Sequence, residues 1–262
     1  MTDKTAGVIK VENIYKSFRG GTEQVLRGVS LEFPVGKLTY ILGSSGAGKS
    51  VLLKHILGLM KPDSGSVWVA GKDISKMRGR QLARHRLVFG MLFQNAALFD
   101  DMTVFENVAF PLREHTTLSE SEIAEKVKKS LTVLGMSSGY YKYPNELSGC
   151  MRKRVGLARA IIREPSILLY DEPTTGLDPV TRTTVDELIE TLKRELKLTS
   201  LVISHDIPSA LLLADNIAFI YQGQIVFWGT PAQFRKAEHT AIKDFLAAEK
   251  RTLLAFQGYA FN

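Results

Sequence analysis

Short apolar runs alternate along the chain with stretches in which apolar residues recur every three or four positions. The short runs predict buried strands, and the longer period predicts helices with one apolar face. This alternation is typical of an α/β fold in which helices flank a mixed sheet. Strands are expected at 8–15, 25–33, 37–42, 166–170, 198–203, 217–221 and 224–228, and helices at 49–60 and 185–196.

A separate helical region is predicted in the middle of the chain. Ser119 and Glu122 have the spacing of a capping box, the pairing that starts many helices. The apolar residues behind it share one helical face: Ile123, Val127, Leu131 and Leu134. We therefore expect a helical insertion between about residues 101 and 145.

Composition narrows the class of protein. The chain has 262 residues, a net charge of +7 and a single cysteine, Cys150. One cysteine excludes an internal disulfide framework and favours a reducing compartment. No run approaches the ~18 apolar residues of a membrane span, and residues 1–10 lack the apolar core of a secretory signal. A soluble intracellular protein is expected.

Residues 43–50 match the phosphate-loop pattern G-x-x-x-x-G-K-[ST] at every fixed position. Glycines let the backbone curl until its N–H groups cradle phosphate oxygens, and the dipole of the following helix also favours an anion. Lys49 would reach the β- and γ-phosphates of a nucleotide, and Ser50 would bind Mg²⁺. An ordinary Gly-Ser turn is disfavoured because a strand and a helix are predicted on either side. The predicted nucleotide contacts here are Gly43, Ser44, Ser45, Gly46, Ala47, Gly48, Lys49, Ser50 and Val51.

A pair of acids, Asp171 and Glu172, directly follows the apolar run 167–170. In a parallel sheet, ligands bind at the carboxyl ends of the strands. Asp171 is then placed to hold Mg²⁺, and Glu172 to polarise an attacking water. A strand that ends in acids is common by itself, so the prediction of nucleotide hydrolysis depends on the phosphate loop as well.

Residues 147–151 (L-S-G-C-M) lie between these motifs and resemble the L-S-G-G-Q signature of ABC-transporter ATPases. Further hallmarks are in register: Gln94 resembles the Q-loop glutamine, 176–179 (G-L-D-P) the D-loop, and His205 the switch histidine. The resemblance implies a RecA-like P-loop NTPase core with an N-terminal antiparallel β layer. It also implies one ATPase domain of residues 1–240 with an inserted helical subdomain at about 101–163.

The same resemblance implies roles for single residues. Phe18 would stack on adenine, His205 would contact the γ-phosphate, and Gln94 would offer an oxygen to metal and water. Ser148 and Gly149 would approach the ATP bound by the opposite subunit, so that catalysis needs a homodimer. Taken singly, Phe18 could instead be a core residue, His205 a capped loop histidine, and Gln94 a solvated side chain.

Several segments of the sequence also resemble one subfamily of these ATPases. Residues 94–99, 101–107 and 110–116 (F-P-L-R-E-H-T), together with Met151, resemble the ATPase of the Mla phospholipid transporters. That ATPase works with a permease and an MCE-domain protein to move phospholipids between the inner and outer membranes. The resemblance implies a peripheral location on the cytoplasmic face of the inner membrane. A permease helix would dock at an apolar surface, with packing in the core of the helical insertion as the alternative for each residue: Leu98, Phe99, Met102, Phe105 and Phe110.

Two other classes of function remain open. The chain could be the ATPase of a different ABC importer or exporter, which only the bound permease would reveal. A non-transport ABC protein is disfavoured, because the phosphate loop and the signature are too close in sequence for a long coiled coil and the chain has one phosphate loop. The basic runs 78–86 and 152–154 lack interleaved aromatic residues, so no nucleic-acid partner is expected.

Two features of the sequence differ from the motifs of the ABC ATPase family or lie beyond them. Cys150 stands where the family has glycine, and it could crowd the nucleotide, gain reactivity at a helix N-terminus, or be a tolerated small residue. The tail 241–262 begins with a helical stretch, 241–251, and ends in large apolar residues: Leu253, Leu254, Phe256, Tyr259 and Phe261. Such clusters usually mark contacts. The Mla-type ATPases that the chain resembles have C-terminal extensions that reach across the dimer, so the resemblance implies that the tail clasps the second subunit, with packing on its own subunit as the alternative.

Overall fold

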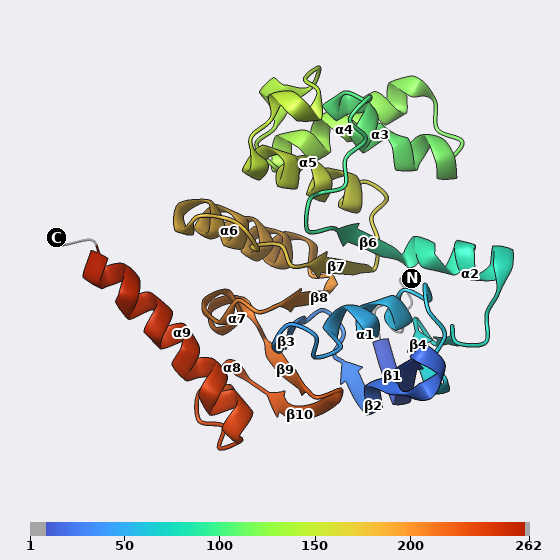
Figure 1. Cartoon of the computed structure of the whole chain (residues 1–262). Coiled ribbons are helices and arrows are strands. Elements are labelled where there is room, and N and C mark those ends of the chain that lie inside the picture. The colour runs from blue at the N-terminus through green and yellow to red at the C-terminus, as the bar shows by residue number, and fades with distance from the viewer. Residues whose placement is uncertain (1–8, 260–262) are drawn as a thin grey trace. The chain divides into compact units, whose positions relative to one another are not determined.

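The computed structural model describes the backbone of residues 9–259 and the side chains of residues 9–249. The chain forms two compact units. Within the described residues, unit 1 consists of Pro34–Lys37 and Met77–Val202, and unit 2 of Ile9–Phe33, Leu38–Lys76 and the chain from Ile203 onward. Their elements are labelled in Figure 1.

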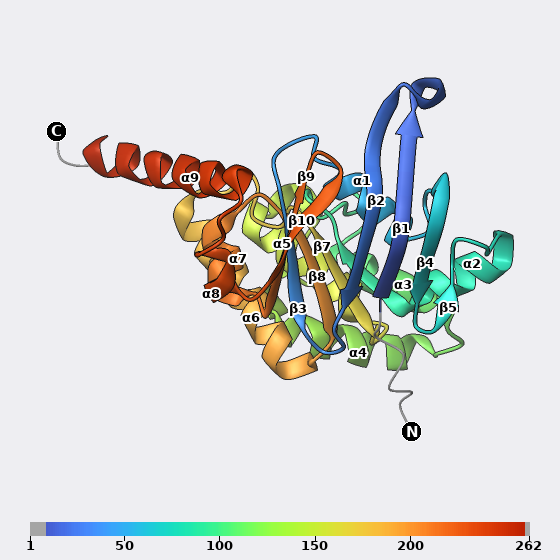
Figure 2. The same ribbon diagram turned by 90° about the horizontal axis from the view of Figure 1, so that it is seen from below.

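Unit 2 contains an antiparallel sheet of four strands. In spatial order these are β2 (Glu23–Phe33), β1 (Ile9–Phe18), β4 (Ser64–Val69) and β5 (Lys72–Asp73), and Figure 2 shows the first three side by side. A 3₁₀ turn, Arg19–Gly21, joins β1 to β2. The N-terminal antiparallel layer implied by the sequence is therefore confirmed.

A second set of strands in unit 2 carries the phosphate loop. The strand β3 (Leu38–Leu42) is wholly buried and runs parallel to β9 (Asn216–Tyr221), which pairs with β10 (Gln224–Gly229) in the predicted hairpin. The helices of this unit are α1 (Lys49–Ile56), α7 (Ile207–Leu213), α8 (Pro231–Phe234) and α9 (Thr240–Tyr259).

The helix α1 is shorter than predicted. The sequence predicts a helix over residues 49–60, but the helix ends at Ile56. Gly58 has a positive φ of 64°, and its N–H donates to the carbonyl of His55. The N–H of Leu59 bonds back to Lys54. A glycine in the left-handed conformation satisfies the last carbonyls and stops the helix, and this signal outweighed the apolar pattern beyond it.

Unit 1 has a parallel pair of strands, β6 (Phe89–Leu92) and β7 (Ile167–Asp171), and β8 (Thr199–Ser204) begins in it. Its helices are α2 (Gly79–His85), α3 (Val104–His115), α4 (Glu120–Val133), α5 (Gly149–Ile161) and α6 (Pro179–Leu196). Short 3₁₀ turns occupy Arg86–Val88, Ser137–Gly139 and Pro144–Glu146.

The helices α3, α4 and α5 contact one another and lie together in Figure 1. The capping box of Ser119 and Glu122 is present at the start of α4. The predicted apolar face is buried, with exposures of 2% or less for Ile123, Val127, Leu131 and Leu134. Both predictions are confirmed. Among the described residues, no helix is long and apolar enough to cross a bilayer.

Candidate functional site

The phosphate loop connects β3 to α1 in unit 2, as predicted. A Cβ atom on Gly43 would lie 2.4 Å from the carbonyl oxygen of Ile220, and one on Gly48 would lie 2.8 Å from Leu26. Gly48 also has a φ of 108°, which other residues rarely adopt. A Cβ on Gly46 would meet nothing within 4 Å. The loop therefore packs tightly on the sheet side and is open on the other, as an anion cradle must be.

Lys49 is the first residue of α1 and is only 7% exposed. Its Nζ donates to the carbonyls of Gly43 at 2.7 Å and Ser44 at 3.0 Å, so the ammonium is held against the loop. Ser50 beside it is exposed, and Val51 is half-buried. A positive charge and an accessible hydroxyl thus meet at the N-terminus of a helix, the arrangement that binds phosphate.

Two more predicted contacts lie in unit 2. Phe18 ends β1 with a half-buried ring, and Lys16 Nζ stands 5.7 Å from its centroid. His205 is exposed, between β8 and the N-cap of α7. That cap is Asp206, which accepts the N–H of Ser209 at 3.2 Å. Both rings are accessible to a ligand, and their roles toward ATP stay predictions.

The acidic pair lies at the carboxyl end of β7 in unit 1. Asp171 is the last residue of the strand, and Glu172 follows with a φ of 48°. A left-handed conformation costs a residue with a side chain about 1–3 kcal/mol and is concentrated at functional sites. The hydroxyl of Thr175 donates to Oε2 of Glu172 at 2.8 Å, which fixes the carboxylate.

The signature residues form the start of α5. Ser148 is its exposed N-cap, and the Ser148 hydroxyl accepts the N–H of Met151 at 3.3 Å. A Cβ on Gly149 would meet only one atom within 4 Å, at 3.9 Å. The space beside Gly149 is therefore open, and Cys150 is half-buried in the same turn.

The Q-loop glutamine lies in a turn, and the D-loop aspartate is the N-cap of a helix. Gln94 is exposed just after β6, and Ala96 and Ala97 behind it both have a positive φ, 59° and 47°. Asp178 of the D-loop is the N-cap of α6 and accepts the N–H groups of Val180 and Thr181 at 3.0 Å. Hydrogen bonds from Thr181 hold the pKa of Asp178 below its usual range.

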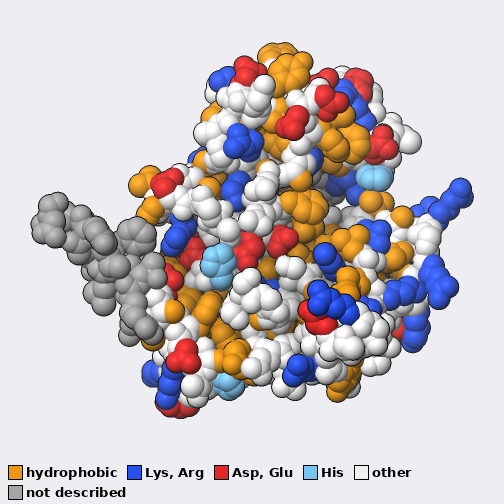
Figure 3. All heavy atoms as spheres, in the orientation of Figure 1, with side chains coloured by type: hydrophobic (Ala, Val, Ile, Leu, Met, Phe, Trp, Pro, Cys, Tyr) orange, Lys and Arg blue, Asp and Glu red, His pale blue; other side chains and the backbone are white. Residues whose placement is uncertain are grey.

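The basic runs differ from a uniformly solvated face. Arg78, Arg80 and Arg84 are exposed along α2, where blue side chains gather in Figure 3, but His85 is buried. In the second run each side chain donates to a carbonyl: Arg152 to Leu147, Lys153 to Gln94 and Pro173, and Arg154 to Leu134. These residues organise the region around the signature, and the sequence pattern gave no sign of it.

The site residues thus fall into two groups. Unit 2 holds the phosphate loop 43–50 with Val51, Phe18 and His205, and unit 1 holds Gln94, Ser148, Gly149, Asp171 and Glu172. Residues 26–175 match the family model described as ABC transporter, and the chain belongs to this family. It is an ATP-binding subunit, and ATP hydrolysis is the activity of the class.

Individual relatives refine the comparison. The chain is 39% identical over 242 residues to the intermembrane phospholipid transport system ATP-binding protein MlaF of Haemophilus influenzae, covering 92% of this chain and 91% of the relative. It is 37% identical to MlaF of Escherichia coli K12, covering 94% and 91%. It is also 39% identical to the probable ribonucleotide transport ATP-binding protein mkl of Mycobacterium leprae, covering 91% of this chain and 68% of that one.

Solved structures support the same class. The chain superposes on cbiO1 of Clostridium perfringens, part of the ABC transporter complex cbiONQ, with a TM-score of 0.80 and 29% identity, covering 93% of this chain and 99% of that one. The dimeric ABC transporter cassette MJ0796 gives a TM-score of 0.77 at 30% identity, covering 85% and 98%. The α/β ABC ATPase fold expected from the motifs is confirmed.

Replacing Cys150 by glycine is expected to leave ATP turnover unchanged or raise it. Glycine is the family residue at this position, and the first turn of α5 would then approach a nucleotide without a side chain in the way. Steady-state hydrolysis by the C150G variant and the wild type measures the effect. A loss of more than about tenfold would show that the thiol itself has a required role.

Proposed function

We propose that the chain energises phospholipid transport between the inner and outer membranes, bound to a separate permease and an MCE-domain protein. The observation that carries the proposal is the likeness to two MlaF proteins over about nine tenths of both lengths. The F-P-L-R-E-H-T stretch, which begins at Phe110 in α3, supports it. Such a subunit would lie on the cytoplasmic face of the inner membrane, held there by the permease.

The proposed active unit is a homodimer with two composite sites. ATP would lie between the phosphate loop of one copy and Ser148 and Gly149 of the other, an isologous arrangement about a two-fold axis. The exposed N-cap Ser148 supports this, because the space beside Gly149 is open to a ligand from outside the subunit. The likeness to a dimeric cassette supports it further.

The donor set fits Mg²⁺ with ATP. Ser50 offers a hydroxyl, Gln94 an amide oxygen and Asp171 a carboxylate, and hard oxygen ligands are what Mg²⁺ prefers. Among residues 9–249, no group of three or more His, Cys, Asp or Glu forms a metal site by itself, as expected for a cation that also uses substrate phosphates. Bound Mg²⁺ would neutralise phosphate charge.

Phosphoryl transfer needs mainly positioning and charge stabilisation. Lys49 would stabilise negative charge on the phosphates, and the loop N–H groups would orient them. His205 would hold the γ-phosphate, and Phe18 would stack on adenine. Glu172 would orient and polarise the attacking water, since Thr175 already fixes one of its two carboxylate oxygens.

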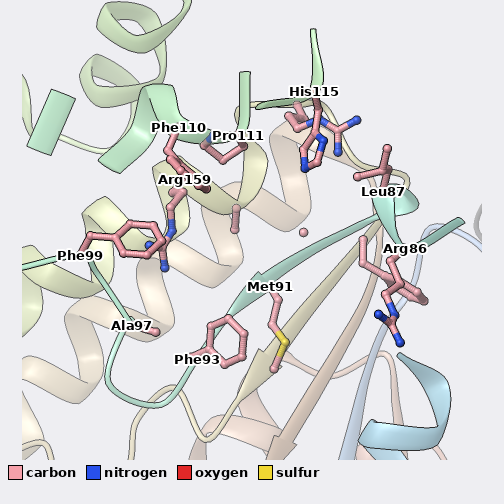
Figure 4. Close-up of a pocket in the computed structure, with 14 residues that line it drawn as sticks. Arg86, Leu87, Met91, Phe93, Ala97, Phe99, Phe110, Pro111, His115 and Arg159 are labelled. Carbon is pink, nitrogen blue, oxygen red and sulfur yellow. The ribbon is translucent and has the colours of Figure 1, made fainter. Parts of the chain in front are cut away.

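A hollow in unit 1 is the proposed dock for the permease. It encloses about 370 Å³, and Met91, Phe93, Phe99 and Phe110 contribute its apolar lining. Figure 4 shows Phe99 and Phe110 on one side and Arg86 and His115 towards the other. The other predicted residues, Leu98, Met102 and Phe105, do not line this hollow, and Phe105 instead stacks on Tyr140 at 4.7 Å.

Side-chain hydrogen bonds to the backbone fix the position of the segment that lines this hollow. Asn107 is fully buried, and its side chain exchanges hydrogen bonds with the backbone N–H and C=O of Phe99 at 2.8 and 3.0 Å. Arg159 donates to the carbonyl of Ala96 at 2.7 Å, with its guanidinium 5.7 Å from the centre of the Phe99 ring. A preformed apolar hollow flanked by basic groups is complementary to an apolar permease segment that carries an acidic residue.

Purification of the tagged chain from its own membranes tests the proposal. We expect a permease and an MCE-domain protein to co-purify, and the F99D variant to lose the permease because it places a charge in the apolar hollow. The matched control is Y141D, on a residue of the same unit that is 82% exposed and outside the hollow. Recovery of a nucleotide permease, as the mkl name would imply, would contradict phospholipid transport.

The tail is proposed as a contact with the second subunit. The helix α9 extends to Tyr259, beyond the predicted end at residue 251. Its start is fixed to unit 2, because Ile242 is fully buried and the Phe245 ring lies 5.2 Å from that of Phe219. The apolar residues that motivated the clasp, from Leu253 to Phe261, lie outside the residues whose side chains the structure describes.

A further inference from the structure

Lys153 is a buried lysine in α5 that the nucleotide chemistry above does not use. It lies one turn after the signature residues, and only 5% of its surface is exposed. Its Nζ donates to the carbonyl of Gln94 at 3.1 Å and to the carbonyl of Pro173. Both acceptors are backbone carbonyls in loops, 59 and 20 residues from Lys153 in the sequence.

Burial of an ammonium group is unfavourable unless hydrogen bonds replace its water. Burial lowers the pKa of Lys153, which reflects this cost. Two carbonyl acceptors offset the cost, and they hold the Nζ atom in one position between the loops. An apolar residue of similar length would fill the same space without this cost, so the charge indicates a role beyond packing.

The two carbonyls belong to segments assigned to hydrolysis. Gln94 is the proposed ligand for metal and water, and Pro173 directly follows Glu172 in the chain. Glu172 has a strained φ of 48°, and such a conformation persists only where surrounding contacts enforce it. The bond from Lys153 to the next residue is one such contact, and the Thr175 hydroxyl supplies another.

The third element joined by Lys153 is α5 itself, whose N-cap is Ser148. The helix is packed closely against the strand that leads to Gln94: a Cβ on Gly156 would lie 2.9 Å from Leu92 and 3.0 Å from Ala96. A small shift of α5 would therefore reach both loops, through this packing and through the Lys153 ammonium.

We propose that Lys153 is a positioning residue that holds Gln94 and Glu172 in register with the signature helix. Contact of Ser148 with the ATP of the second subunit would then set the geometry of hydrolysis through Lys153. The proposal rests on the roles proposed above for Gln94 and Glu172. It predicts an effect on turnover with little effect on ATP binding, because the phosphate loop belongs to unit 2.

The test is steady-state ATP hydrolysis by the full-length protein carrying K153M, K153Q or K153R. We expect K153M to lower kcat by about tenfold or more while KM for ATP changes by less than about threefold. K153Q keeps an uncharged NH2 group that can donate hydrogen bonds, so its kcat should fall between those of K153M and the wild type. K153R keeps the charge and should recover most of kcat. The matched control is K129M, on an exposed lysine of α4, with no expected change.

The E172Q and K153M variants test the roles of Glu172 and Lys153 separately. E172Q is measured in parallel: if it keeps turnover, the proposed role of Glu172 fails. If E172Q loses turnover while K153M retains it, the role of Lys153 is overturned. Parallel loss of ATP binding, melting temperature and turnover in K153M, with no recovery in K153R, would show a merely structural role. If K153M does not fold, an unchanged kcat in K153Q overturns the proposal.

Discussion

Replacing Lys49 by alanine is expected to reduce ATP hydrolysis to below about one hundredth of the wild-type rate. The ammonium is nearly buried, is bonded to Gly43 and Ser44, and is the only lysine of the loop. Its removal leaves the phosphate charge without its main side-chain counterion. Phosphate release by the purified K49A variant at saturating ATP measures the effect, and its ATP affinity should fall as well.

The control is K54A, which removes an exposed lysine from the same helix. It should hydrolyse ATP normally, which excludes a general effect of charge removal on α1. Near-normal hydrolysis by K49A would remove the basis for assigning residues 43–50 as the phosphate loop of this enzyme.

The E172Q variant is expected to bind ATP, lose turnover and accumulate as a closed dimer. A glutamine oxygen can still accept the Thr175 hydroxyl, so the local geometry should survive while the charge that polarises water is lost. ATP binding and the oligomeric state are measured together with phosphate release. We expect turnover to fall below about one tenth of the wild-type rate.

The control for this prediction is E187Q, an exposed position in α6. It carries the same chemical change away from the proposed site and should leave turnover and oligomeric state unchanged. Turnover above about a tenth of the wild-type rate in E172Q would show that Glu172 is not the base.

Strong apolar patterns predicted most of the fold, and short elements were missed. The strands β1, β2, β3, β7, β8, β9 and β10 were all expected, within a few residues at each end. The strand β6 was missed because it has only four residues, one of them Gly90. The strand β4 (S-G-S-V-W-V) was missed because glycine and serine at its start are typical of a turn.

The phosphate-loop motif could be recognised in the sequence because phosphate binding fixes residue types and spacing within one short loop. The roles of the site residues toward ATP stay predictions. The lining of the docking hollow was predicted only in part. The five predicted residues are all large and apolar, and only packing decides which of them line the cavity: Leu98, Phe99, Met102, Phe105 and Phe110. Lys153 looked like one member of a basic run. Its acceptors, Gln94 and Pro173, lie 59 and 20 residues away, and no local pattern encodes such a contact.

ATP hydrolysis by this chain is proposed to drive phospholipid transport. The most direct measurement reconstitutes the purified complex, with its permease and MCE-domain partner, and follows transfer of a labelled phospholipid to acceptor vesicles. Transfer should require ATP with the wild-type chain and should stop with E172Q, which still binds ATP. Equal transfer with E172Q, or ATP-driven movement of nucleotides instead of phospholipid, would contradict a role in ATP-driven phospholipid transport.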